Sequence, residues 1–353
     1  MADFAKILSD LKKADYSDLH IYPGEICFAR EKGRLSELKN VKFTEDELKK
    51  IILGTSSPKA REVLGKQKQV NYSYEDSAGH RYRFSVFFSK GKFALSVRFI
   101  PSSPAVLADL GLPDQFKKIL AKPSGLIIVS GPSGHGKTTT ISALVDFINQ
   151  HFEKNIITVE NPVEIKYKDN LSSIIQRGIP LDVPNFFEGL NEAYRLDPDV
   201  IVTDSIGYKD ALDQAFFLCE AGCMVIAASD GEDSQKILEK IINSRPTEER
   251  ETVKEKLVAH LNMVICQRLI HHIDLSRSAV FDIIISTPLI RNVLKGEGSL
   301  NMLKSLQDQD KEWGMSTFEK CLRKRLDKLQ ITPAVAAAFF EGNTEMAAKF
   351  VKK

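Results

Sequence analysis

The sequence predicts an α/β protein, with a small α+β domain at the amino-terminal end and then a larger domain built on a mostly parallel sheet. Short apolar runs alternate with helical segments in the second part of the chain, at residues 126–130, 156–160, 200–204 and 224–229. These runs lack polar alternation and are rich in β-branched residues, as is typical of strands buried on both faces of a parallel sheet. Three prolines within residues 101–115 indicate a linker between the α+β part and the α/β part.

We therefore divide the chain into a first domain at residues 1–100, a linker at 101–115 and a second domain at 116–353. From about residue 234 the second domain reads as mainly helical, with one further strand around 279–286. The tail after residue 332 also reads as helix, and the sequence gives it no role.

The first domain is predicted from local patterns. Apolar residues at helical spacing predict a helix near residues 4–11. Thr44 followed by Glu47 predicts a capping box that opens a second helix, which we expect to end on Gly54. Strands are expected from alternating residues at 17–21, 70–76, 81–88 and 93–100, the middle pair forming a hairpin.

Charge and hydropathy exclude several classes of partner. Lys and Arg number 49 and Asp and Glu number 47, so no overall charge attracts nucleic acid or an anionic membrane. No apolar stretch has the length of a signal peptide or of a membrane span. We expect a cytoplasmic protein without membrane insertion and without a nucleic-acid partner.

The strand predicted at 126–130 runs directly into a glycine-rich stretch that fits G-x-x-x-x-G-K-[ST], and an amphipathic helix follows it. Glycines let the backbone turn its N–H groups inward around an anion, and the helix terminus adds positive potential. The sequence therefore predicts a nucleotide-binding loop. Its predicted binding residues are Gly131, Pro132, Ser133, Gly134, His135, Gly136, Lys137, Thr138 and Thr139.

Such a loop binds ATP with Mg²⁺ as cofactors. Lys137 is expected to contact the β- and γ-phosphates, and Thr138 to ligate Mg²⁺. Asp204 ends a predicted strand and is a candidate Mg²⁺ ligand of the Walker B kind. Glu160 and Glu164 lie around the end of another strand, and either could orient the attacking water. The loop alone does not separate motors, kinases, GTPases and transporter ATPases.

Further segments resemble one family, the PilT-like ATPases that retract type IV pili in twitching motility. The similar segments are TVENPVEIKY (158–167), IIQRGIPLDVPNFFEGLNEAYRLDPDVIV (174–202), SDLHIYPG (17–24), RYRFSVF (81–87), VRFIP (97–101), CQRLI (266–270), STPLIRNVLKGEG (286–298) and MSTFEKCL (315–322). They occur in the family's order over roughly residues 1–330.

The resemblance implies a PAS-like first domain, a RecA-like ATPase domain with a helical carboxyl-terminal region, and ATP bound between the two domains. It also implies a homo-hexamer, or a mixed hexamer with a paralogue. The hexamer would act on an inner-membrane pilus platform protein at the cytoplasmic face of the membrane. Carried over by position, Glu164 is the general base, and Arg83 and Arg98 approach the phosphates.

Several residues depart from the family pattern. Ser205 and Gly207 replace the Walker B Glu and the Arg that follows it, and Asp204 stands one residue early. Asp230 stands where the family has a catalytic-site histidine, and Asn161 replaces an aspartate. We therefore expect weakened ATP hydrolysis behind an intact phosphate loop.

Two functions follow from these observations. The first is a retraction motor ATPase, and the alternative is a catalytically impaired nucleotide-binding accessory or regulatory subunit of the same machine. An unrelated kinase would need a substrate domain, and a nucleic-acid translocase would need a basic channel. The resemblance of the first domain and the near-neutral charge disfavour both functions.

Overall fold

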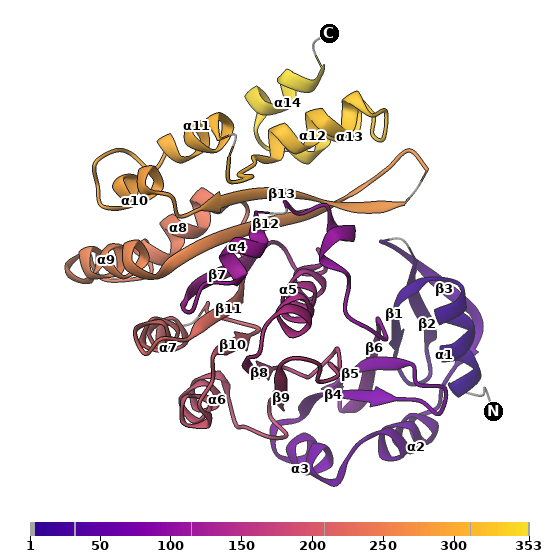
Figure 1. Ribbon diagram of the computed structural model, residues 1–353. Helices are drawn as coiled ribbons and strands as arrows, with labels where there is room; N and C mark the ends of the chain where they lie inside the picture. The colour runs from indigo at the N-terminus through magenta and orange to yellow at the C-terminus, as the bar shows by residue number, and fades with distance from the viewer. Residues whose placement is uncertain are drawn as a thin grey trace. The chain divides into compact units, whose positions relative to one another are not determined.

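The computed structural model describes residues 4–31, 33–113, 115–207, 209–274, 276–310 and 312–351 (Figure 1). The chain forms two compact units. The first comprises Met1–Pro104, Thr158–Lys168 and Ile175–Gly189, and the second comprises Ala105–Ile157, Asp169–Ile174 and Leu190–Lys353. The units are thus interleaved along the sequence. The boundaries that we drew at residues 100 and 115 stay a prediction.

The amino-terminal hundred residues form one sheet with three helices. Its strands lie in the order β3-β2-β1-β6-β5-β4, and the neighbouring strands are antiparallel. The elements are α1 (Phe4–Lys13), β1 (Tyr16–Ile21), β2 (Ile26–Glu31), β3 (Arg34–Lys42), α2 (Glu45–Thr55), α3 (Pro58–Gln67), β4 (Gln69–Glu75), β5 (Arg81–Ser89) and β6 (Lys92–Ile100). The predicted hairpin is confirmed as β4 and β5, whose alternating inward residues include Tyr72 and Phe84, with rings stacked at 5.5 Å.

The start of α2 follows the predicted capping box. The Thr44 side chain accepts a hydrogen bond from the Glu47 amide, and the Glu47 carboxylate accepts one from the Thr44 amide at 2.8 Å. The expected end on Gly54 is wrong by one residue, because α2 continues to Thr55. The Thr55 hydroxyl there donates to the carbonyl oxygen of Ile51 at 2.8 Å.

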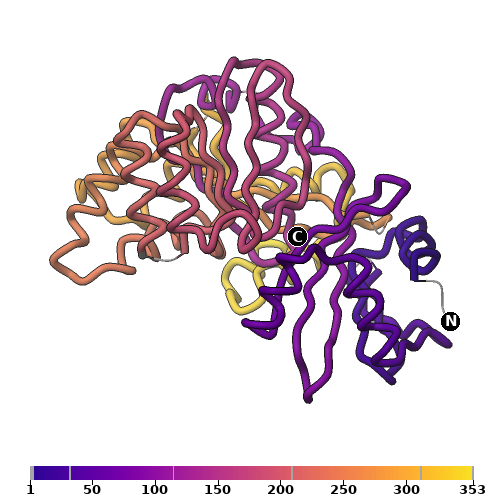
Figure 2. The backbone as a smooth tube through the Cα atoms, turned by 90° about the horizontal axis from the view of Figure 1, so that it is seen from below, coloured from indigo at the N-terminus to yellow at the C-terminus, as the bar shows by residue number. Residues whose placement is uncertain are grey.

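The rest of the chain builds a second sheet, in the strand order β13-β12-β7-β11-β10-β8-β9. Its elements are η1 (Leu107–Leu110), α4 (Phe116–Leu120), β7 (Gly125–Ser130), α5 (Lys137–His151), β8 (Asn155–Glu160), β9 (Ser173–Gly178), α6 (Phe186–Ala193), η2 (Tyr194–Leu196), β10 (Val200–Thr203), α7 (Lys209–Glu220), β11 (Met224–Ser229), α8 (Ser234–Asn243), η3 (Thr247–Glu249), α9 (Arg250–His260), β12 (Leu261–His271), β13 (Arg277–Ile285), α10 (Pro288–Leu294), α11 (Met302–Gln309), α12 (Phe318–Asp327), α13 (Pro333–Phe339) and α14 (Thr344–Val351). The four apolar runs are confirmed as β7, β8, β10 and β11, and the order of the chain can be followed by colour in Figure 2.

The expectation of only one strand after residue 234 is wrong. The segment β12 is a long strand that pairs in parallel with β7 and antiparallel with β13. Its residues from Leu261 to Gln267 are all buried. A short apolar run without alternation does not distinguish a doubly buried strand from a buried helix, so the sequence pattern gave no separate signal for β12.

The parallel pairing places three strand ends at one edge of the second sheet. Ser130 at the end of β7 pairs with Ser229 of β11, and Ala227 of β11 pairs with Thr203 of β10. Because parallel strands end at the same edge, the segments that follow β7, β10 and β11 emerge together. These are the phosphate loop, Asp204 and Asp230.

Candidate nucleotide site

The phosphate loop lies between the end of β7 and the start of α5. Three of its glycines have positive φ, at 147° for Gly131, 78° for Gly134 and 87° for Gly136. At Gly131 a Cβ atom would lie 2.3 Å from the carbonyl oxygen of Gln267 on β12. Glycine is therefore required there both by conformation and by the close approach of the neighbouring strand.

The loop opens to solvent where a phosphate would bind. Ser133, Gly134 and Thr138 are exposed, and Thr138 lies in the first turn of α5. The first N–H groups of a helix have no acceptor within that helix, and together with the dipole of the 15-residue α5 they favour an anion at this terminus. The loop residues predicted from the sequence thus form a cradle suited to phosphate.

Lys137 points back into this cradle. Its ammonium group donates to the carbonyl oxygens of Gly131 at 2.6 Å and Pro132 at 3.3 Å. The third contact is an ion pair with the Asp230 carboxylate at 2.8 Å. The Lys137 side chain is 17% exposed and that of Asp230 is 77% exposed, so one partner is enclosed and the other lies in solvent.

The segment after β11 brings Asp230 to this position. A Cβ atom at Gly231 would lie 2.2 Å from the Ile237 side chain, so a glycine lets the chain pass close to α8. Lys240 donates to the carbonyl oxygen of Asp230 at 3.0 Å. A carboxylate at this position repels a nearby phosphate. The structure adds that its carboxylate already holds the lysine that a phosphate needs.

Replacing Asp230 with Asn is expected to tighten the binding of Mg-ADP by about two- to tenfold, because an exposed ion pair is weak and the lost carboxylate also repelled phosphate. Isothermal titration calorimetry would measure this change. Glu232→Gln is the matched control, since Glu232 lies in the same segment but pairs with Lys236. Equal effects of both substitutions would show that general charge alone is responsible.

Strand β12 supports the loop at His135. The Gln267 side-chain amide donates to the His135 carbonyl oxygen at 2.7 Å. The Leu269 main-chain amide donates to Nδ1 of the His135 ring at 2.9 Å, which requires that nitrogen to be unprotonated. Burial lowers the pKa of His135, and the nearby charges of Arg268, Lys137 and Arg277 lower it further. Sequence reasoning used 266–270 only as a family motif and missed this support.

Asp204 follows β10 directly and is half-buried at the same edge of the sheet as the loop. After it, the Ser205 hydroxyl accepts a hydrogen bond from the Gly207 amide at 3.3 Å, forming a short turn. Within the described ranges, no group of three or more His, Cys, Asp or Glu side chains could hold a metal ion. The hydroxyl of Thr138 and the carboxylate of Asp204 are nevertheless the oxygen ligands that Mg²⁺ prefers, alongside phosphate and water.

The candidate base Glu164 lies in the first unit and is held there on two sides. Its carboxylate pairs with the Arg83 guanidinium at 2.7 Å, with side chains 14% and 29% exposed. Arg81 donates to the carbonyl oxygens of Glu164 at 2.7 Å and Val163 at 3.0 Å. The sequence assigned Arg83 and Glu164 separate roles, and the structure pairs them.

Glu160 and Arg98 are also engaged within the first unit. The Glu160 carboxylate accepts hydrogen bonds from Thr158 at 2.5 Å and Gln176 at 3.1 Å, and its residue is only 7% exposed. Burial raises the pKa of Glu160. Arg98 pairs with the buried carboxylate of Asp18 at 2.8 Å. An enclosed Glu160 is less suited than Glu164 to activating a water molecule.

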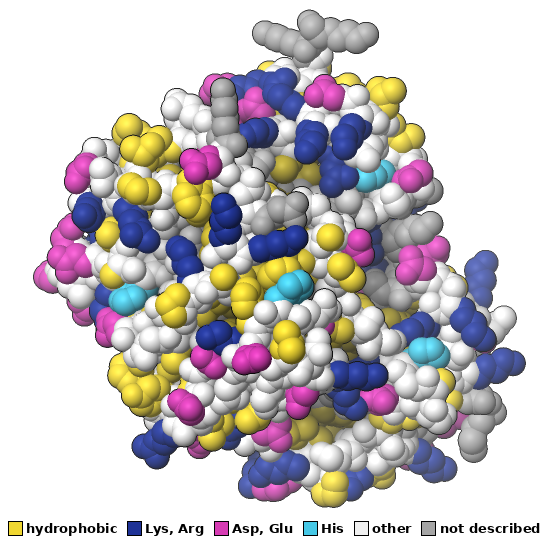
Figure 3. Space-filling view, viewed as in Figure 1, with side chains coloured by type: hydrophobic (Ala, Val, Ile, Leu, Met, Phe, Trp, Pro, Cys, Tyr) yellow, Lys and Arg dark blue, Asp and Glu magenta, His cyan; other side chains and the backbone are white. Residues whose placement is uncertain are grey.

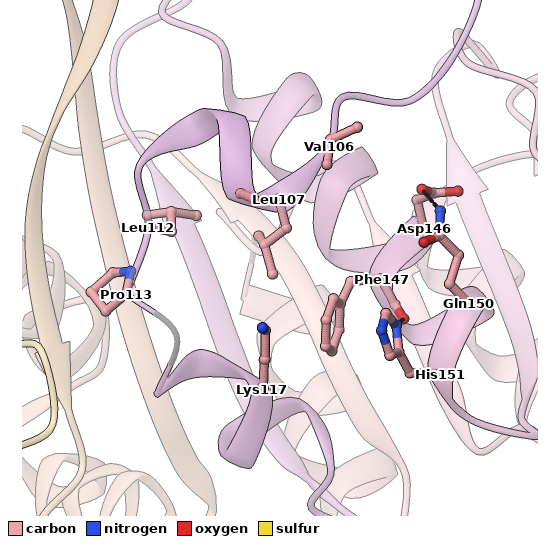
Figure 4. A pocket seen from close by; sticks show the side chains of 10 residues that line it. Val106, Leu107, Leu112, Pro113, Lys117, Asp146, Phe147, Gln150 and His151 are labelled. Carbon is pink, nitrogen blue, oxygen red and sulfur yellow. Dashed lines mark hydrogen bonds between the residues drawn. The ribbon is translucent and has the colours of Figure 1, made fainter.

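A cavity of about 200 Å³ lies elsewhere on the second unit (Figure 4). It is lined by Phe147, His151 and Asp146 from the carboxyl-terminal half of α5, and by Leu107 and Leu112 from the segment before α4. Asp146 follows Lys137 by roughly 13 Å along the helix axis at a rise of about 1.5 Å per residue. The cavity is thus separate from the phosphate loop.

A loop of this shape between a buried parallel strand and a helix, with carboxylates at the same sheet edge, defines a P-loop nucleotide-binding protein. Residues 3–327 match the family described as Type II/IV secretion system protein. The chain belongs to this family.

Relatives extend over most of the chain. It is 29% identical to the uncharacterized protein YggR of Escherichia coli, over 89% of this chain and 95% of that protein. It is 28% identical to the type IV pilus retraction ATPase PilT of Pseudomonas aeruginosa, over 91% of this chain and 93% of that protein. The crystal structure of the pilus retraction motor PilT with bound ADP superposes with a TM-score of 0.86 at 28% identity, covering 99% of this chain and all of the other.

The fold is shared more widely. The ATPase DotB of Legionella pneumophila superposes with a TM-score of 0.79 at 22% identity, covering 96% of this chain and 95% of that one. The predicted family and fold class are thereby confirmed. Across the part of the chain that the structure describes, no helix combines the length and apolarity needed to cross a membrane.

Proposed function

We propose that this chain is an ATP-hydrolysing motor subunit of a type IV pilus retraction system. The observation that carries the proposal is an open phosphate loop with Lys137 directed into it, in a chain similar to PilT along almost its whole length. Both the sequence and the structural comparison extend over the first unit as well as the phosphate loop. A likeness of this extent favours a pilus motor over an unrelated kinase or translocase.

In the proposed mechanism, ATP displaces Asp230 from Lys137, whose ammonium group then neutralises the β- and γ-phosphates. Thr138 and Asp204 would hold Mg²⁺, which supplies charge neutralisation on the phosphate oxygens when bound. Glu164 accepts the proton of the attacking water, and its carboxylate is oriented by Arg83. Arg98 and Arg83 remain candidates for phosphate contact.

The proposed assembly is a hexamer of this chain, or a mixed hexamer with a paralogue, at the cytoplasmic face of the inner membrane. Its proposed partner is the inner-membrane pilus platform protein. Figure 3 shows Lys and Arg side chains mixed with Asp and Glu over the face in view, in keeping with a net charge of +2. A near-neutral net charge does not favour nucleic acid as a partner.

The alternative function is a nucleotide-binding accessory or regulatory subunit that has lost catalysis. It is favoured by the Asp230 carboxylate on Lys137, and by Ser205 and Gly207 where the family has charged residues. Loss of one group that stabilises a transition-state charge commonly costs about 10²–10³ in rate.

Steady-state ATP hydrolysis by the purified protein tests the proposal, with Lys137→Ala and Glu164→Gln as baselines. We expect at least about one turnover per minute above both baselines, which is still roughly 600-fold below the kcat of a median enzyme. Mg-ATP binding with hydrolysis no faster than Glu164→Gln would establish the accessory function instead. Sedimentation with and without nucleotide tests the hexamer, and a monomer under every condition would refute it.

A further inference from the structure

Strand β12 contacts the phosphate loop with one face. Gln267 and Leu269 both bind His135, and their side chains also approach the loop glycine Gly136. A Cβ atom at Gly136 would lie 3.0 Å from the Gln267 amide nitrogen and 4.0 Å from the Leu269 side chain. This end of β12 therefore determines where the middle of the loop lies.

Arg268 lies between these residues and points to the other face, because side chains alternate along a strand. Its guanidinium carbon is 4.4 Å from the centroid of the Phe339 ring. One of its nitrogens also donates to the Phe339 carbonyl oxygen at 3.2 Å. Arg268 thus joins β12 to the end of α13 by a cation–π contact and a hydrogen bond.

The tail that carries Phe339 is itself packed within the second unit. The Phe339 ring meets Phe318 of α12 edge-on at 5.0 Å. Phe340 stacks on Phe350 of α14 at 5.6 Å. Near the hairpin end, the Ile273 amide donates to the Gln330 carbonyl oxygen at 3.0 Å. Figure 1 shows α12 and α13 lying next to the β12–β13 hairpin, with α14 packed on their outer side.

We propose that Arg268 and Phe339 are positioning residues for nucleotide binding: the carboxyl-terminal segment Pro333–Val351 holds β12 through Arg268, and β12 holds the phosphate loop at His135. This assigns a role to the tail that the sequence left unexplained. The inference rests on the proposed nucleotide binding at the loop, and it does not depend on the pilus function.

The physical reason is preorganisation. A loop already shaped for phosphate loses little conformational entropy when the nucleotide binds. If Arg268 releases Phe339, the end of β12 gains freedom, and the hydrogen bonds from Gln267 and Leu269 to His135 weaken with it. We expect the affinity for nucleotide to fall and the rate of the chemical step to stay the same, because neither Arg268 nor Phe339 touches the reacting atoms.

The His135 ring reports on Arg268 separately. Burial lowers the pKa of His135 most, and the charge of Arg268 has the next largest effect. Removing its charge is expected to raise that pKa toward the ordinary value, whereas Phe339→Leu leaves the charge in place. Titration of the His135 ring by NMR follows this difference.

The test is the affinity for Mg-ADP, measured by calorimetry on the full chain. We expect Arg268→Ala and Phe339→Leu each to weaken binding by about three- to tenfold. The double variant should be no weaker than Arg268→Ala, because both changes break the same contact. The affinity of Arg268→Lys for Mg-ADP should lie between those of wild type and Arg268→Ala, since lysine keeps the charge but lacks the planar guanidinium group. In hydrolysis, KM should rise while kcat stays unchanged.

Arg323→Ala is the matched control, because Arg323 makes the same kind of contact with another tail ring, Phe350 at 5.2 Å, but lies on α12. It should change the affinity by less than about twofold. Wild-type affinity in Arg268→Ala, or an equal loss in Arg323→Ala, would overturn the inference. If the wild-type chain itself binds no Mg-ADP, the proposed function fails instead. Thermal unfolding of each variant shows that a loss of binding comes from a folded protein.

Discussion

Replacing Glu164 with Gln is expected to lower steady-state ATP hydrolysis by about 10²–10³ while leaving the affinity for Mg-ATP within about threefold of wild type. Gln keeps the side-chain oxygen that accepts from Arg83, and the main-chain contact with Arg81 is unchanged. The substitution therefore removes the proton acceptor with little change in structure. Single-turnover hydrolysis and calorimetric binding would separate the two quantities.

The matched control is Glu160→Gln, a carboxylate four residues earlier in the same stretch. Glu160 is enclosed by hydrogen bonds from Thr158 and Gln176, and Gln can accept both. We expect its rate to stay within about threefold of wild type, because an enclosed group does not reach solvent. If Glu160→Gln produced the large loss and Glu164→Gln did not, the general base would be Glu160.

Replacing Lys137 with Ala is expected to weaken Mg-ATP binding by at least about tenfold and to lower hydrolysis by about 10³. The loss has two parts. The phosphates lose the ammonium group, and Asp230 loses its partner at 2.8 Å, so that an uncompensated carboxylate faces the phosphate. Fluorescent-nucleotide binding and steady-state hydrolysis measure the two effects.

A second variant tests the part assigned to Asp230. The double variant Lys137→Ala/Asp230→Asn should bind Mg-ATP more tightly than Lys137→Ala alone. It lacks the Lys137 ammonium group but also lacks the Asp230 carboxylate that repels the phosphate. Lys236→Ala is the control, since Lys236 pairs with Glu232 in the neighbouring segment. Affinity as high in Lys137→Ala as in wild type would contradict the assignment of this loop as the nucleotide site.

The parts of the fold that follow local rules could be predicted from the sequence. Runs of β-branched residues predicted the buried strands, and Thr44 with Glu47 predicted the start of α2. The phosphate loop was predictable because its shape depends on glycines close together in sequence. Strand β12 was not, because its identity is decided by pairing with β7, far away along the chain.

The contacts of the candidate site could be predicted only in part. Nothing local relates Arg83 to Glu164, and the sequence gave them independent roles. Asp230 was recognised as a departure from the family, yet its pairing with Lys137 depends on the parallel register of β11 and β7. Contacts of this kind arise from the topology of the sheet, so residue spacing alone does not reveal them.

The interleaving of the two units has a consequence for how the protein is made. Arg81 is 5% exposed, and its side chain donates to the carbonyl oxygens of Val163 and Glu164. A nascent chain that has left the ribosome only as far as Pro104 lacks these two acceptors, so Arg81 would keep its pairing with Glu75 but lack both of these hydrogen bonds. The whole phosphate loop is synthesised before Thr158–Lys168 and Ile175–Gly189, the segments that complete the first unit. We therefore expect the amino-terminal unit to finish folding only after the nucleotide-binding loop has been translated.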